Sequence, residues 1–149
     1  MMVRSSFLIA CFISLSAFAQ SAKIHNPINT GVNMTVAILA VDSLIIVGDT
    51  IVALYKIDNV NYKESTTYAN PDDFTIAGLT VWKGERLAIA LWGNDSTSDK
   101  KDGFLNNEAI NWAIIKNNKY VPVNMMYRVG NNYWKPNGIS IVDSVKIGC

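Results

Sequence analysis

The sequence predicts an all-β protein, an antiparallel β-sandwich of the immunoglobulin-like or jelly-roll type, with a barrel as the alternative. After residue 20 the apolar residues recur with a period of two, which is typical of strands. Polar clusters rich in Gly, Asn, Asp and Pro separate these short apolar runs. No segment of useful length has the 3.6-residue period of a helix. About seven to nine short strands at regular spacing are typical of sandwiches and barrels.

The predicted strands follow one another along the chain in six apolar runs. The runs are residues 34–41, 48–58, 74–82, 86–93, 109–129 and 138–147. In the second run Ile51, Ala53 and Tyr55 alternate with the residues of the other face. The preceding segment, residues 21–30, is either a leading strand or an irregular lead-in.

Two short connections predict hairpins. Residues 83–85 contain Gly84 and join the runs 74–82 and 86–93. In the run 109–129, Asn117 and Asn118 can adopt the left-handed conformations that a tight turn needs, so this run is predicted to form two strands.

The first 19 residues have the features of a secretory signal peptide. Arg4 supplies a positive charge, a short apolar run follows, and small residues close it at residues 17–19. We therefore expect a signal peptide at 1–19 and one domain at 20–149, in a secreted, extracellular or cell-surface protein, with the periplasm as an alternative. A lipoprotein signal ending at Cys11 is a rival interpretation, but the apolar run continues beyond Cys11.

Charge and cysteine content restrict the classes of partner. Removal of Arg4 with the signal peptide leaves 12 Lys and Arg against 12 Asp and Glu, without a basic stripe, so no nucleic-acid partner is expected. No later apolar run is long enough to span a membrane as a helix. Cys149 is then the only cysteine, so no internal disulfide is expected. An intermolecular disulfide through Cys149 is one alternative, and an inert thiol is another.

The connection 92–108 is the first candidate site. Asp95, Asp102 and Glu108 offer the hard oxygen ligands that calcium prefers. The spacing does not match an EF-hand, and two lysines at 100–101 lie within the acidic cluster. The favoured interpretation is a polar connection with no cofactor, in which aspartates cap turns and Gly103 allows a positive φ. A calcium site is the alternative.

The aromatic residues are the second candidate. Trp82, Trp92 and Trp112 lie within predicted strands and are expected in the core. Tyr133 and Trp134 lie in a polar loop before the last strand. This pair either folds under its loop or faces outward as a contact that could bind a ligand such as a sugar.

Catalysis is not expected. The only histidine, His25, is close to the mature N-terminus. Without a second His or an internal Cys, the chain lacks the residues for a zinc site or a catalytic triad. The remaining catalytic alternative is a glycoside hydrolase that uses two carboxylates. Its candidate residues are Glu64, Glu85 and Glu108.

Several separated pieces resemble one known family. "VGDTIVALY", "LTVWKGERLAIALWGND", "DGFLNNEAINWAI" and "NGISIV" are similar to a recurrent extracellular β-sandwich module with the pattern GDxI, VWxG, WGDD and DG…E. That module occurs in surface and secreted proteins of bacteria that use type IX secretion. Asn94 and Asn107 depart from its pattern, and no C-terminal sorting domain follows residue 149. We therefore expect either a small stand-alone relative of this module or a truncated product.

The resemblance implies a function without catalysis. We expect a binding, adhesion or structural module outside the cytoplasm, whose partner is an extracellular protein or a polysaccharide. The alternative is a carbohydrate-binding module that uses Tyr133 and Trp134 and is stabilised by calcium.

Overall fold

The computed structural model describes residues 22, 24–57 and 73–148. The predicted signal peptide, Glu64 and Cys149 lie outside this part of the chain. The described residues form seven strands and no helix. The strands are β1 (Asn33–Ile38), β2 (Thr50–Lys56), β3 (Phe74–Val81), β4 (Leu87–Trp92), β5 (Asn111–Lys116), β6 (Lys119–Val129) and β7 (Ile139–Ile147). The described residues contain no helix that is long and apolar enough to cross a membrane.

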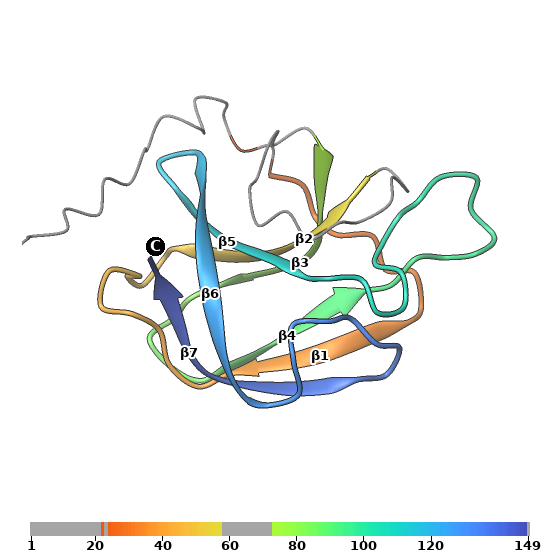
Figure 1. Ribbon diagram of the computed structural model, residues 1–149. Coiled ribbons are helices and arrows are strands. Elements are labelled where there is room, and N and C mark those ends of the chain that lie inside the picture. The colour runs from red at the N-terminus through yellow and green to blue at the C-terminus, as the bar shows by residue number, and fades with distance from the viewer. Residues whose placement is uncertain (1–21, 23, 58–72, 149) are drawn as a thin grey trace, which may run out of the picture.

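The strands form one sheet that curls until it is nearly a barrel. Their order is β3-β2-β5-β6-β7-β1-β4. Figure 1 shows β6 crossing from the layer of β2, β3 and β5 to the layer of β1, β4 and β7. The all-β prediction, with its barrel alternative, is confirmed. Every pair is antiparallel except β1 with β7, which is parallel. This pair was not expected from an antiparallel sandwich.

The main core lies between these two layers and follows from the period of two. On β1 the buried residues are Met34, Val36 and Ile38, which alternate with partly exposed neighbours. Trp82 and Trp112 are buried in this core as predicted, whereas Trp92 is only half-buried.

β2 and β5 are buried on both faces. Ile51, Ala53 and Tyr55 belong to the main core, as the predicted alternation requires. The opposite face of β2 contributes Val52 and Leu54 to a second apolar cluster. That cluster also contains Ala22, whose backbone N–H donates to the carbonyl of residue 118 at 2.6 Å. A sheet that is buried on both sides gives these two strands continuous apolar runs.

One of the two predicted hairpins is confirmed. Asn117 and Asn118 have φ values of 49° and 59°, and β5 and β6 pair from Lys116 with Lys119 onward. These are the left-handed conformations of a two-residue turn that matches the strand twist.

The hairpin predicted at residues 83–85 is wrong. Gly84 does have a positive φ of 83°, but β3 and β4 share no ladder and stand at opposite ends of the strand order. The backbone of Trp82 instead bonds to Gly48 and Asp49, at 2.9 and 2.8 Å. β4 instead pairs with β1 along its whole length. The two strands therefore approach at the seam of the curled sheet without pairing.

Candidate functional site

The long connection between β4 and β5 folds back tightly on the end of β4. Gly93 forms a parallel bridge with Phe104, and the N–H of Phe104 donates to the Trp92 carbonyl at 3.1 Å. A Cβ atom on Gly103 would lie 2.3 Å from the Gly93 carbonyl oxygen. Gly103 is thus needed for close backbone approach, although no positive φ was found there.

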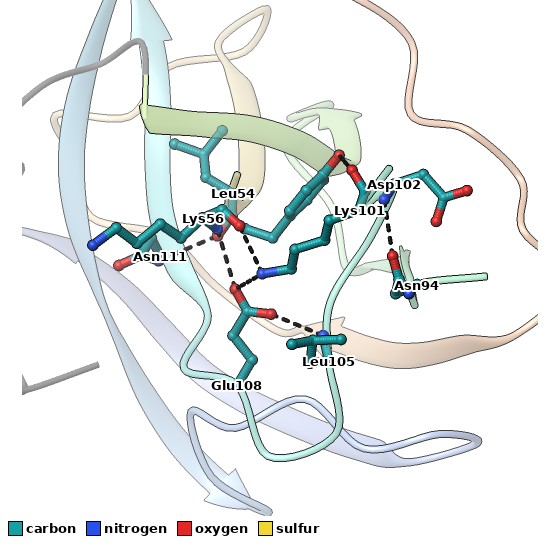
Figure 2. A network of polar contacts seen from close by, with 9 residues as sticks. Leu54, Lys56, Asn94, Lys101, Asp102, Leu105, Glu108 and Asn111 are labelled. Atoms are coloured by element: carbon teal, nitrogen blue, oxygen red, sulfur yellow. Dashed lines mark hydrogen bonds and ion pairs between the residues drawn. The ribbon is translucent and has the colours of Figure 1, made fainter. Parts of the chain in front are cut away.

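Glu108 is the centre of a polar network beneath this connection (Figure 2). Its Oε1 accepts from the Lys101 ammonium at 2.7 Å and from the Lys56 backbone N–H at 3.1 Å. Its Oε2 accepts from the Leu105 N–H at 2.8 Å. The Lys101 ammonium also donates to the Lys56 carbonyl at 2.6 Å and lies 5.4 Å from the centre of the Tyr55 ring. The carboxylate therefore ties the connection to the end of β2.

The aspartates of the same connection stabilise its turns. Asp102 Oδ1 accepts from the Asp95 N–H at 2.8 Å, and the Asp102 N–H donates to Asn94 Oδ1 at 3.0 Å. Asp95 Oδ1 accepts from the N–H and hydroxyl of Thr97, at 2.8 and 2.7 Å. The Thr97 N–H, followed by its hydroxyl, lowers the pKa of Asp95. Such bonds are the turn-capping role that short acidic side chains often have.

The three predicted calcium ligands thus have different partners. Glu108 bonds with Lys101, Asp102 with the backbone of Asp95, and Asp95 with Thr97. In residues 22, 24–57 and 73–148, no three His, Cys, Asp or Glu side chains form a group suited to a metal. Of the carboxylates considered for glycoside hydrolysis, Glu85 is exposed at the β3–β4 turn and Glu108 is in the network.

Trp134 folds under its loop. Its side chain is 4% exposed, and its indole N–H donates to the Leu91 carbonyl at 2.9 Å. Its ring stacks on Phe104 at a centroid distance of 6.5 Å and lies against Gly93. Tyr133, which is 40% exposed, is therefore the only member of the predicted pair available at the surface.

A groove opens where β5 and β6 diverge. Its volume is about 530 Å³. It is lined by Ile110, Asn111, Trp112, Pro122, Val123, Asn124, Met125, Tyr127, Asn132 and Gly148. None of these lining residues is acidic or basic. The groove is therefore suited to an uncharged ligand that has both apolar and hydrogen-bonding groups.

Three side chains form a hydrogen-bonded cluster at one end of the groove. The Trp112 indole N–H donates to the Tyr127 hydroxyl and to Asn132 Oδ1, both at 3.1 Å. The Tyr127 hydroxyl donates to Asn132 Oδ1 at 3.0 Å, and Asn132 Nδ2 donates to the Ile110 carbonyl at 2.8 Å. Each group holds the next, so this end of the groove is preorganised.

Burial raises the pKa of Tyr127 to about 12 from an ordinary value of 10.0, while its bond with Trp112 acts in the opposite direction. Below pH 10 the phenol is neutral in both the folded and unfolded chains, so its contribution to stability is complete. Above that pH the unfolded chain ionises first, and the contribution is lost as the pH rises toward about 12. We expect the unfolding free energy to fall less steeply with pH in Tyr127→Phe than in the wild type. Urea titrations between these pH values measure both slopes, and equal slopes would contradict the assignment.

The groove residues were not predicted as a site. Of these residues, only Trp112 was considered, as a core residue of a predicted strand. One feature of the sequence does indicate an interrupted ladder here, because Pro122 lies inside a long apolar run. A proline lacks the N–H that a central ladder needs and is found at strand edges and irregularities.

The fold and the site together define an all-β protein with a preformed groove that is lined by uncharged residues. No family model, curated protein or solved structure matches the chain.

Proposed function

We propose that this protein is a binding module without catalytic activity, secreted or held at the cell surface, and that its ligand occupies the groove between β5 and β6. The observation that carries the proposal is the groove itself, which combines uncharged lining with the fixed Trp112–Tyr127–Asn132 cluster. Ligand sites are commonly preformed recesses with a few oriented polar groups. The signal-like residues 1–19 and the resemblance to extracellular modules support a location outside the cytoplasm.

The polar network around Glu108 supports this proposal indirectly. Its carboxylate bonds with the Lys101 ammonium and two backbone N–H groups, so its role is to hold the long connection. That connection leads directly into Ile110 and Asn111, which line the groove. We therefore assign the network to the scaffold and the groove to recognition.

The test is a nuclear magnetic resonance titration of the ¹⁵N-labelled protein with linear peptides and soluble neutral polysaccharides. We expect a ligand to shift the Trp112 indole and Asn132 side-chain amide signals. Asn124→Trp, an exposed lining position, should fill the groove and abolish these shifts. Ala88→Trp, an exposed position on β4, is the matched control and should retain them. Binding that survives Asn124→Trp, or shifts confined to other surfaces, would remove the groove as the site.

A polysaccharide is one candidate class of ligand, and the exposed ring of Tyr133 favours it. Tyr133 is held beside the groove because it forms a bridge with Ala109, next to the lining residue Ile110. An exposed aromatic face can stack on the apolar side of a sugar ring. Loss of polysaccharide binding in Tyr133→Ala, with retention in Tyr133→Phe, would support this alternative.

A further inference from the structure

The ladder between β5 and β6 stops before β6 ends. Its last pair is Ala113 with Pro122, yet β6 continues to Val129. From Val123 onward β6 pairs with β7 on its other side. The edge of β6 that faces the groove therefore has no ladder along this stretch in the described part of the chain.

The backbone N–H and C=O of Met125 lie on the edge of β6 that faces the groove. Met125 is paired with Val145 of β7. Val145, however, directs its N–H to the Ala40 carbonyl at 3.1 Å and its carbonyl to the Asp42 N–H at 2.8 Å. A residue of an antiparallel strand directs both groups to the same side, so Met125 and Val145 are a pair without mutual hydrogen bonds. The N–H and C=O of Met125 consequently face the groove.

Tyr127, two residues further on, has a similar orientation, although the register between β6 and β7 shifts on both sides of it. It is paired with Val142, whose carbonyl accepts from the Leu39 N–H at 2.9 Å on the side of β1. The backbone groups of Tyr127 therefore also face away from β7. Met125 and Tyr127 together present two sets of donors and acceptors, at the alternate spacing with which a strand receives a neighbour.

The walls of the groove fit a polypeptide better than a sugar. Trp112 is only 2% exposed and its indole N–H is already bonded, so its ring offers no surface for stacking. Ile110 and Val123 are buried as well, at 2% and 8% exposed, so the accessible lining consists of Pro122, Met125 and uncharged polar side chains such as Asn124. An extended chain can place its backbone on the open edge and its uncharged side chains against this lining.

We propose that the groove binds an extended, uncharged polypeptide segment of a partner protein, which adds to the open edge of β6 as a new strand. This inference rests on the proposed binding function and names the ligand class for the same groove. The backbone of Met125 and Tyr127 supplies affinity. The absence of charged lining residues selects against charged segments.

The probe is a phage-displayed library of random linear peptides, with the selected peptides then synthesised and measured by fluorescence anisotropy. We expect the selected sequences to be uncharged. Met125→Pro removes the N–H that faces the groove but none that bonds to β7, and should weaken binding about tenfold or more. Met125→Leu is the matched control and should bind as the wild type does. Equal binding by Met125→Pro, with its fold verified by circular dichroism, would overturn the inference.

N-methylated peptides test the same inference on the wild-type protein. If the peptide adds as a strand, N-methylation at alternate positions should weaken binding, whereas the intervening positions should tolerate it. If N-methylation has no effect but Asn124→Trp abolishes binding, the groove remains the site and strand addition is wrong. If no peptide is selected and a neutral polysaccharide shifts the Trp112 indole signal, the polypeptide is wrong and the binding function stands. If no probe reaches the groove, both proposals fail.

Discussion

Substitution of Glu108 by Ala is expected to reduce the free energy of unfolding by about 3–5 kcal/mol, the range for removing one partner of a buried ion pair. The side chains of Lys101 and Glu108 are only 9% and 7% exposed. The change would leave the Lys101 ammonium buried without its carboxylate. It would also deprive the N–H groups of Lys56 and Leu105 of their acceptor. Urea denaturation followed by tryptophan fluorescence measures the loss.

The double variant Lys101→Met/Glu108→Ala separates the ion pair from the rest of the network. Because it removes the unpaired ammonium as well, we expect it to be more stable than Glu108→Ala alone. Glu108→Gln should lie between the wild type and Glu108→Ala, since its amide oxygen still accepts one of the bonds. If the double variant and Glu108→Ala are equally unstable, the buried charge does not explain the effect.

Most of the strands could be predicted because their signals are local. The alternation of Met34, Val36 and Ile38 and the paired asparagines at 117–118 act over a few residues, and the structure has the corresponding strand and turn. The 83–85 connection has equally good turn chemistry, yet it forms no hairpin. Its outcome depends on Gly48 and Asp49, which are more than thirty residues away in the chain and take the backbone groups of Trp82. Turn propensity does not specify which neighbour each strand edge will take.

The interpretation of the 92–108 connection as a polar link with turn-capping aspartates agrees with the bonds of Asp95 and Asp102. The role of Lys101 was not predictable, because it depends on the Lys56 carbonyl and the Tyr55 ring, which belong to β2. The same is true of the groove. Its open edge exists because β6 changes layers after Pro122. Only the bonds of Val145 to Ala40 and Asp42, which follow β1 in the chain, show where Met125 points.

The fate of Trp134 could not be decided from sequence, because a Tyr-Trp pair in a polar loop is compatible with either burial or exposure. Burial is explained by two features of β4. The Leu91 carbonyl accepts the indole N–H, and Gly93 leaves room for the ring, since a Cβ there would lie 2.3 Å from the Trp134 ring. The indole thus links the loop before β7 to the end of β4.

Trp134→Ala is therefore expected to reduce the free energy of unfolding by about 3–5 kcal/mol, the range for truncating a buried Trp or Phe. The loss combines an unfilled cavity beside Phe104 with an unsatisfied carbonyl at Leu91. Chemical denaturation monitored by far-ultraviolet circular dichroism is the suitable measurement, because it does not depend on the deleted fluorophore.

Two variants give this prediction its control. Tyr133→Ala changes the adjacent, 40% exposed residue and should cost about 1 kcal/mol or less, because surface substitutions generally have small effects. Trp134→Phe keeps an aromatic ring against Phe104 but loses the bond to Leu91, and should cost about 1–3 kcal/mol. From the most to the least stable, the order should therefore be Tyr133→Ala, Trp134→Phe and Trp134→Ala. If Trp134→Ala were as stable as Tyr133→Ala, the indole would have to face solvent, and the outward-facing contact of the Tyr133–Trp134 pair would be restored as a candidate ligand site.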